Sequence, residues 1–542
     1  MSELAEKLIA QFNAEEAKAA NFRNLYQETA DLVFPRENQI TSVQTPGAEK
    51  TDRIVDTTAI MASQEMASGL SQNLVPPGQP FFALQATDRE VNKAERVRRY
   101  LSEISDITHE HLFSSNFLMQ LNETLRSLSV FGTGCLFSQY DLGLNFIDYD
   151  IGNYVIMENS KRRVDQIFVK FCYTATQAFE KWGEKAGGLV VDAMKDSKTS
   201  NKTFEFLHYV APRGTGNPLL KNNINMPFAS YYIAIKDKIE IEEGGFEEFP
   251  YHVVRWSKSS NEVWGRGQGT FALPDVRMLQ WMKAGLIECA NKLNNPPLEV
   301  LESFEGEVRV GPGQINNVLE LGSIRALQRD ALGNFPISKD ILLMQQEDVK
   351  NLFFNDIFKQ LSDLKGDRRT TLEIRERIGE GLQRLGPPIG RINEELFTPL
   401  INRNVFLLLR NGRLPEPPQE LLGQDFKIEY IGRLALELKS HQARAAQGWV
   451  GDIASMAEAF PDALDVVNVD STVKLLGTTR GVNVENINTD EVIAAKRKAR
   501  ADQIAQQQAL EMAQAAGKTY KDASGAAEAG SPAAALQEAM GG

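Results

Sequence analysis

The chain has 542 residues, 42% of them apolar and 24% charged, which is ordinary for a soluble globular protein and enough for about three or four domain-sized units. Its 59 Lys and Arg against 72 Asp and Glu give a net charge of -13. That balance argues against a surface that wraps nucleic-acid phosphates, because such surfaces need clustered cations.

Targeting and redox signals are sparse. Cys135, Cys172 and Cys289 are odd in number and far apart, so we expect neither a disulfide framework nor a zinc cluster. No run of about 18 apolar residues predicts a membrane span. The N-terminus has the pattern of an acidic amphipathic helix rather than of a signal peptide, so we expect synthesis and folding in cytoplasm.

The first part of the chain has helical periodicity over residues 3–33, 54–74 and 89–128. The breaker VPPGQPFF follows the second of these helices, and we expect its two phenylalanines to pack in the core. His109 and His111 in the third helical region lie on different helix faces, so they do not form a metal pair and are interpreted as packing or surface residues.

From Ser129 to about Ser260 the period changes to that of short strands rich in β-branched and aromatic residues, interrupted by a helix around 174–194. We therefore expect an α/β region with a mostly antiparallel sheet. The glycines of GRGQG that follow lack both the Walker lysine and the G-x-G-x-x-G spacing. They are interpreted as a flexible lead-in to a helix from near Pro274 to Leu293.

The most informative stretch runs from Ile337 to Leu385. Ser338 can cap a helix over 338–361, a rod of roughly 37 Å at about 1.5 Å per residue, and a second helix is predicted from near Thr371. Between them lies a short polar loop with three cations, Lys365, Arg368 and Arg369, and two aspartates. Taken alone, such a tip has the ordinary interpretation of a solvated turn between helices.

Beyond it, GPPIGR at 386–391 is expected to bend the chain ahead of an amphipathic helix that ends at Asn411–Gly412. The segment FKIEYIGRL is predicted as a strand, and 434–460 and 461–480 as helical. Asn488 can cap a final helix. The Ala-rich and Gly-rich residues 517–542 are expected to be disordered.

No catalytic constellation is present: the chain has no H-E-x-x-H, G-x-S-x-G or C-x-x-C motif and no complete phosphate loop. Five histidines give little material for acid–base or metal chemistry. The sequence therefore favours a scaffold or conduit over an enzyme, with no cofactor and no metal.

The order of these parts resembles the portal proteins, or head-to-tail connectors, of short-tailed bacteriophages of the T7-like group. The resemblance covers most of the chain, through LVPPGQPFF, EVWGRGQGTFALPDVRMLQ and, most specifically, LSDLKGDRRTTLEIRERIGEGLQRLGPPIGRINEELFTPLINR. That tract joins a long helix to a basic-tipped loop and then to an E-L-x-x-P-L helix, here Glu395 to Leu400.

The resemblance implies an α+β, mainly helical portal fold with wing, stem, clip and crown, assembled as a ring that usually has twelve subunits. The implied parts are the wing (1–272), the first stem helix (273–293), the clip (294–337), the second stem helix (338–361), the tunnel loop (362–371), the tunnel helix with the return to the wing (372–430), the helical crown (431–516) and a disordered tail (517–542).

The resemblance also implies partners and a place. The ring would sit at one capsid vertex of the virion, as the channel for DNA packaging and ejection. It would contact the major capsid and scaffolding proteins, the large terminase, and then the tail adaptor and internal core proteins, with double-stranded DNA passing through and no membrane involved. Lys365, Arg368 and Arg369 would narrow that channel.

Two alternatives stay open at this stage. A ring-forming adaptor without a DNA-gating role would be built from the same helices and the same acidic charge. An ATP-driven packaging motor is disfavoured by the missing Walker A lysine loop.

Overall fold

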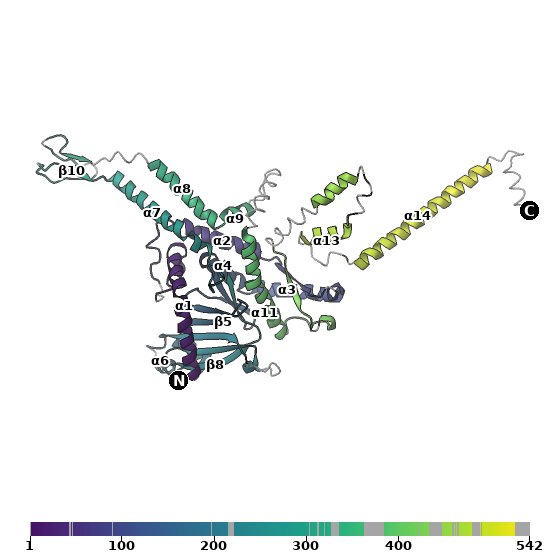
Figure 1. The fold of residues 1–542 in the computed structure, drawn as a ribbon, viewed down its shortest axis with the longest axis horizontal. Helices are drawn as coiled ribbons and strands as arrows, with labels where there is room; N and C mark the ends of the chain where they lie inside the picture. Colours follow the sequence, from purple (N-terminus) through teal and green to yellow (C-terminus); the bar gives the residue numbers. More distant parts are fainter. Residues whose placement is uncertain are drawn as a thin grey trace, which may run out of the picture. The chain divides into compact units, whose positions relative to one another are not determined.

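In the computed structural model the residues described are 2–326 (except 43, 44, 46, 89, 197, 215–221, 303, 312, 313 and 319), 335–362, 384–432 (except 422), 447–457, 460, 462, 466–479, 488 and 490–525. The chain forms two compact units. The first comprises Met1–Asn92 and Arg96–Gln442, and the second comprises Ala443–Gly542 with Lys93–Glu95. Figure 1 shows the elements of both.

Two antiparallel sheets form the centre of the first unit, where the sequence predicted a single, mostly antiparallel sheet. The five-stranded sheet has the order β4-β5-β6-β7-β8, and the three-stranded sheet has the order β3-β2-β9. Their strands are β2 (Thr133–Tyr140), β3 (Leu144–Asp148), β4 (Tyr154–Glu158), β5 (Val164–Thr174), β6 (Thr203–Pro212), β7 (Phe228–Ala234), β8 (Ile239–Phe246) and β9 (Tyr251–Arg255).

Helices cover both faces of the five-stranded sheet. α1 (Glu3–Val33), which has the predicted bounds, packs on one face, where Leu8 and Phe12 meet Leu207 and Phe168. α5 (Ala175–Trp182) and α6 (Gly188–Met194), joined by the short helix η3 (Gly183–Ala186), pack on the other face beside Phe206. Neighbouring residues of a strand point to opposite faces of the sheet. In β6, Phe206 therefore packs in the core under α5 and α6, and Leu207 packs in the core under α1.

The helical region predicted over 89–128 consists of two helices, α3 (Glu95–Ser114) and α4 (Phe117–Phe131), after the short helix η2 (Val91–Lys93). Asn116 lies at the break, and its side chain bonds the backbone of Phe146 in both directions, at 2.8 and 2.9 Å. An Asn side chain that bonds a strand in this way favours a non-helical backbone at its own position. The break between α3 and α4 therefore comes from the contact of Asn116 with β3.

α2 (Thr58–Leu74) is rich in small residues and packs on α4. η1 (Pro35–Glu37) lies between α1 and α2. Phe81 and Phe82, each 1% exposed, pack as predicted around His109, whose ring stacks on Phe82 with centroids 4.1 Å apart. His109 is thus a core residue, in agreement with its interpretation as a packing histidine.

The GRGQG segment is not a flexible lead-in but a site of close backbone packing. A Cβ on Gly267 would lie 2.5 Å from the nitrogen of Gly132, and one on Gly269 would lie 2.6 Å from the carbonyl oxygen of Val130. Only glycine leaves room for two backbones this close, which accounts for the spacing without a nucleotide.

α7 spans Gln268–Asn294 and so begins before the predicted start near Pro274, which lies inside the helix. The prediction used proline as a first-turn marker, yet a helix tolerates an internal proline at the cost of one backbone hydrogen bond. α8 (Phe335–Leu352) likewise begins before Ser338, which is therefore not its N-cap. Between α7 and α8 the short strands β10 (Leu298–Val300) and β11 (Ile324–Ala326) pair antiparallel, as expected for this segment.

The chain after 383 does not bend at GPPIGR as predicted. Residues 384–392 are helical and continue through the π-helical turn η6 (Asn393–Phe397) into α11 (Thr398–Arg410). The fixed φ of proline near −65° is compatible with a helix. Two adjacent prolines are therefore not enough to predict a bend in the chain. After η7 (Gln419–Leu421), β12 (Phe426–Tyr430) forms within the predicted strand and pairs with β1 (Phe82–Ala86).

The second unit contains a helix over 447–457, α13 (Val469–Thr479) and α14 (Asp490–Gly525). α14 extends past 516, so residues 517–525 are helical and the disorder expected there is wrong. Alanine and lysine are strong helix formers and outweigh the glycine at 517. Residues 526–542 lie outside the described part of the chain.

Candidate functional site

The predicted basic residues Lys365, Arg368 and Arg369 lie outside the described residues, as does the predicted start of the following helix near Thr371. What the structure describes is the frame at both ends of segment 363–383. On one side stand α7, α8 and the short helix α9 (Asn355–Ser362), and on the other the helix from 384 onward. The site is therefore described from these supports.

Asp56 joins the two long helices to the body of the first unit. Its side chain is 1% exposed, and its Oδ2 accepts from Lys283 Nζ on α7 at 3.0 Å and from Gln346 Nε2 on α8 at 2.9 Å. Gln280 on α7 accepts from the backbone N–H of Asp56 at 2.7 Å and donates back to its carbonyl at 2.7 Å. One buried carboxylate thus fixes α7, α8 and the start of α2 together.

The electrostatics of Asp56 fit this role. Burial opposes its ionisation, but hydrogen bonds from Thr58, Lys283 and Gln346 outweigh burial and hold the pKa of its carboxyl below the usual range. Gln345 on α8 also donates to Asp275 on α7 at 3.1 Å. The pair α7 and α8, seen side by side in Figure 1, is thus held by polar contacts at two levels.

The second long helix is broken, against the prediction of one rod over 338–361. α8 ends at Leu352, Phe354 has a φ of +57°, and α9 starts at Asn355. A left-handed non-glycine residue inside an apolar run is costly and persists only where its surroundings enforce it.

Three contacts enforce this break. Phe353 is fully buried, and the Phe354 ring lies 6.3 Å from that of Trp256. With its amide oriented to satisfy both groups, Gln268 donates to the carbonyl of Leu352 at 3.2 Å and accepts from Trp256 Nε1 at 3.2 Å. The side chain of Gln268 therefore bonds a carbonyl that the broken helix leaves without its usual partner.

Beyond the break, α9 packs on α2. Asn355 donates to Glu65 Oε2 at 2.8 Å, and Phe358, 8% exposed, lies over Gly69, where an added Cβ would clash with its ring. The small residues of α2 noted in the sequence therefore also receive α9. As a result, the chain enters segment 363–383 from a helix anchored on the body.

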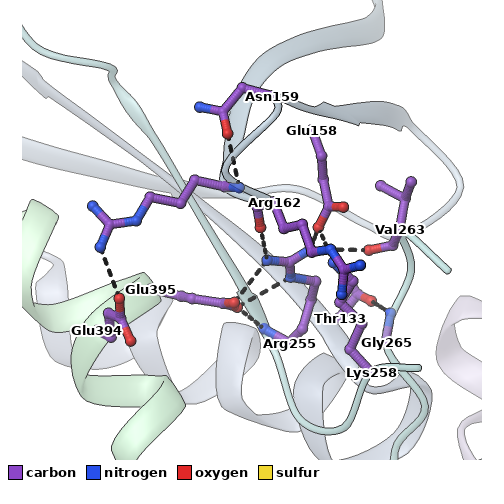
Figure 2. Close-up of polar contacts among 11 residues, drawn as sticks. Thr133, Glu158, Asn159, Arg162, Arg255, Lys258, Val263, Gly265, Glu394 and Glu395 are labelled. Carbon is purple, nitrogen blue, oxygen red and sulfur yellow. Dashed lines mark hydrogen bonds and ion pairs between the residues drawn. The ribbon is translucent and has the colours of Figure 1, made fainter. Parts of the chain in front are cut away.

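The chain leaves that segment through helix 384–392 and η6, which a buried arginine anchors (Figure 2). Arg255, at the end of β9, is 2% exposed and forms a two-pronged pair with Glu395 on η6, at 2.7 and 3.1 Å. Its backbone N–H also donates to Glu395 at 2.9 Å. Two-pronged arginine–carboxylate pairs fix orientation as well as distance.

The same guanidinium pairs with Glu158 at the end of β4, and Glu158 pairs in turn with Lys258. Burial opposes the charged form of Arg255, but the bonds and charges of Glu395 and Glu158 outweigh it and raise the pKa of the guanidinium. Two carboxylates and two cations therefore balance in a buried network that links β4, β9 and η6.

Beside this network runs a groove of about 820 Å³ between the β4–β5 turn and the helix from 384. Three exposed cations, Lys161, Arg162 and Arg163, lie along it, and Arg163 pairs with the exposed Glu394 at 2.9 Å. Figure 2 shows Glu394 and Glu395 side by side on one turn, with Glu395 facing Arg255. The groove is thus lined by charges of both signs together with aromatic and apolar side chains, among them Phe228, Phe249 and Val253.

Three histidines of the described region are buried and poorly suited to acid–base chemistry near neutral pH. Burial lowers the pKa of His109 to about 4 and that of both His208 and His252 to about 3. Although His252 lies 2.9 Å from Ser138, both side chains are buried among β2 and β9. Among the described residues no group of three acidic, histidine or cysteine side chains could hold a metal ion, and no described helix is long and apolar enough to cross a membrane.

Sequence reasoning missed Asp56, Arg255, Glu158 and the Phe354 break. Glu395 had a signal, since it opens the E-L-x-x-P-L motif that carried the family resemblance. Asp56 and Arg255 had none, because the partners that tie them to other elements are distant in sequence. Asp56 bonds Gln280, Lys283 and Gln346, and Arg255 bonds Glu158 and Glu395.

Comparisons with known proteins agree with a structural protein. The family model described as bacteriophage head to tail connecting protein matches residues 5–487. The portal protein of Salmonella phage epsilon15 is 27% identical over 527 residues, 95% of this chain and 94% of that protein. The probable portal protein of Bordetella phage BPP-1 is 25% identical over 523 residues, 94% of each chain. The portal protein of Pseudomonas phage phiKMV is 22% identical over 356 residues, 62% of this chain and 64% of that protein.

These matches define the class as a structural, non-enzymatic component of a phage virion, located at a capsid vertex. The chain belongs to the bacteriophage head to tail connecting protein family. The predictions of a portal-type protein that connects head to tail, and of a virion protein that is not an enzyme, are confirmed by this membership.

Proposed function

We propose that this chain is the portal subunit of a short-tailed phage of the T7-like group, and that about twelve copies form a closed ring around a DNA channel. The observation that carries the proposal is the arrangement of α7, the β10–β11 module, α8 and α9, followed by segment 363–383, whose two ends are anchored on the body and whose sequence carries the cations Lys365, Arg368 and Arg369 near its start. A channel loop needs such fixed ends, because a constriction on mobile supports would not hold a set diameter.

The parts of the chain then take the following roles. The sheets with α1 to α6 are the wing, α7 and α8 are the stem, residues 295–334 are the clip, and 363–371 form the tunnel loop. Helix 384–392 with η6 and α11 returns to the wing. The crown is the helical region from 431 to 516, most of which belongs to the second unit.

The charge distribution supports a channel in which DNA slides. A charge of -13 on each copy gives a ring that repels phosphates overall, while a circle of Lys365, Arg368 and Arg369 supplies weak, salt-dependent contacts at the constriction. In this account the acidic walls prevent adhesion and the basic loop retains packaged DNA.

The partners follow from the proposed position at the vertex. The ring contacts the major capsid and scaffolding proteins and encloses double-stranded DNA. The clip docks the large terminase during packaging and the tail adaptor afterwards, and the crown faces the internal core proteins.

The test is a triple variant, Lys365→Gln, Arg368→Gln and Arg369→Gln, scored for ring assembly and for the yield of DNA-filled heads. We expect intact rings and a clear loss of filled heads, because the phosphate contacts at the constriction are gone. The matched control removes three exposed wing lysines, Lys185, Lys195 and Lys198, and should leave the yield unchanged.

A normal yield of filled heads from the triple variant would contradict the DNA-retaining role and leave a ring-forming adaptor. An ATPase assay on the purified protein distinguishes the portal and the adaptor from a packaging motor, since both predict no ATP hydrolysis.

A further inference from the structure

The strand β9 is an edge of the three-stranded sheet, and its side away from β2 pairs with no other strand among the described residues. Its bonds to β2 alternate along the chain: the carbonyl of Pro250 accepts from the N–H of Ser138 at 3.0 Å, and the N–H of Trp256 donates to the carbonyl of Gly132 at 2.9 Å. In an antiparallel pair the residues between such bonds direct their N–H and C=O groups to the other side. These residues form the open edge of β9 and are Tyr251, Val253 and Arg255.

The open edge of β9 lies at the groove beside the Arg255 network, since all three of its residues line that groove of about 820 Å³. The N–H of Arg255 donates to Glu395 at 2.9 Å, so one position of the edge has a partner. In the part of the chain that the structure describes, no partner bonds the outward N–H and C=O groups of Tyr251 and Val253. Buried backbone groups rarely stay unbonded, so water or a ligand in the groove must bond them.

The lining of the groove carries an excess of positive charge. Glu395 pairs with Arg255, and Glu394 pairs with Arg163. The third carboxylate, that of Asp165, accepts from the side-chain amide of Asn159 at 3.0 Å. The cations that form no ion pair with a described residue are Lys161, Arg162 and Arg391. A chain with a net charge of -13 thus contains a groove with more cations than carboxylates.

The turn between β4 and β5 presents three of these cations in succession. Asn159 fixes the turn, because its Oδ1 accepts from the N–H groups of Lys161 and Arg163 at 2.9 and 3.1 Å. Arg162 has a φ of +60°, which is uncommon for a residue with a long side chain. Its carbonyl accepts from Arg255 Nη2 at 3.4 Å, so the turn is attached to the buried network (Figure 2). The exposed side chains of 161–163 are therefore held beside the groove by a turn of defined conformation.

These groups together indicate the chemistry of a ligand. The open edge offers N–H donors and C=O acceptors at the spacing of a strand, and another peptide backbone matches both. A phosphate group accepts hydrogen bonds and would leave the carbonyls unbonded. The unpaired cations favour carboxylates on the peptide. Phe228 and Phe249, whose rings lie 5.5 Å apart, also line the groove and can receive an apolar side chain.

We propose that this groove binds an extended acidic peptide segment of a partner protein, which adds as a strand to the open edge of β9. Tyr251 and Val253 bond the backbone of the segment, and Lys161, Arg162 and Arg391 bind its carboxylates. The five residues from 251 to 255 extend over about 17 Å at 3.4 Å per residue, which sets the length of the paired stretch. The proposal concerns a single copy of the chain, so it holds whatever number of copies assembles.

The first experiment measures the binding of a fluorescent hexapeptide of alternating valine and glutamate to the full-length protein by fluorescence anisotropy. We expect saturable binding that added salt weakens. The triple variant Lys161→Gln, Arg162→Asn and Arg391→Gln should weaken it by about tenfold or more, because the unpaired cations are gone. Asparagine is chosen at 162 because it tolerates a positive φ.

The matched control is the triple variant Lys185→Gln, Lys195→Gln and Lys198→Gln, which removes three exposed lysines away from the groove. It should leave the affinity for the peptide unchanged.

Two further measurements separate strand addition from attraction between charges. The same peptide with every backbone nitrogen methylated keeps its carboxylates but cannot donate a backbone hydrogen bond, so it should not bind. Hydrogen exchange at residues 251–255 should slow when the unmodified peptide is added, and should not change with the methylated one.

The absence of saturable binding to the wild-type protein would overturn the proposal and would mean that water or another part of the chain bonds the open edge. Equal binding of the methylated peptide, or equally strong competition by inorganic phosphate, would also overturn it and leave a site for anions in general.

Discussion

A cluster of carboxyl groups, Glu37, Asp148 and Asp150, lies where η1 meets the end of β3. Burial is the largest cause that raises the pKa of all three, and repulsion from neighbouring carboxylates adds to it. The pKa of Asp148 rises to about 7, although Thr124 donates to its Oδ1 at 2.6 Å. The folded first unit therefore holds protons at pH values where the unfolded chain has lost them.

The sign of the pH dependence follows from this difference. Between the usual Asp pKa near 4 and the value of about 7, the folded state binds more protons than the unfolded state, so the free energy of unfolding falls as pH rises. One such group gives a slope of up to about 1.4 kcal/mol per pH unit. We expect Asp148→Asn, which keeps the acceptor for Thr124, to flatten that slope and to raise the melting temperature at pH 8.

Thermal unfolding between pH 4 and 8 checks this expectation, with the exposed Asp141→Asn as the control. Equal slopes for wild type and Asp148→Asn would mean that this carboxyl is ionised in the folded protein throughout the range.

At the scale of elements, two adjacent glutamates of η6 provide a matched pair. Glu395 is 20% exposed and pairs with Arg255, which is 2% exposed, whereas Glu394 is 66% exposed and pairs with Arg163, which is 72% exposed. Glu395→Gln leaves a buried guanidinium short of charge and should cost about 2 to 4 kcal/mol of unfolding free energy. Glu394→Gln should cost less than about 1 kcal/mol, because water screens its pair.

Urea unfolding of the two variants gives both free energies, and limited proteolysis shows whether helix 384–392 loosens in Glu395→Gln. Equal small losses in both variants would contradict the account of Arg255 as the anchor of this helix.

The elements that the sequence predicted well are those with local causes. α1 has its expected bounds because its apolar residues recur at helical spacing, and the strands between Thr133 and Arg255 follow their β-branched and aromatic runs. The break at Phe354 had no such local signal, since Phe353 and Phe354 continue the apolar period. It is imposed by Trp256 and Gln268, about 90 residues earlier in the chain.

The candidate site also has a part that could be predicted from local sequence and a part that could not. The basic residues of the loop were visible in sequence, and their role stays a prediction because they lie outside the described residues. Their supports were not visible, because Asp56 and Arg255 act through partners distant in sequence. Even the glycines at 265, 267 and 269, noted for a loop, have their reason in backbone packing against residues 129–132.

At the scale of the whole molecule, the proposed ring would have to meet two opposing demands on a channel. Subunits must adhere firmly to one another, yet must not adhere to the polyanion that passes between them. In the proposed ring, the net charge of -13 on each copy would serve the second demand.

The ring itself is the central claim, and negative-stain electron microscopy of the purified protein with native mass analysis tests it most directly. The account predicts rings of about twelve subunits with a central hole wide enough for duplex DNA. A stable monomer or a closed dimer without a hole would contradict it.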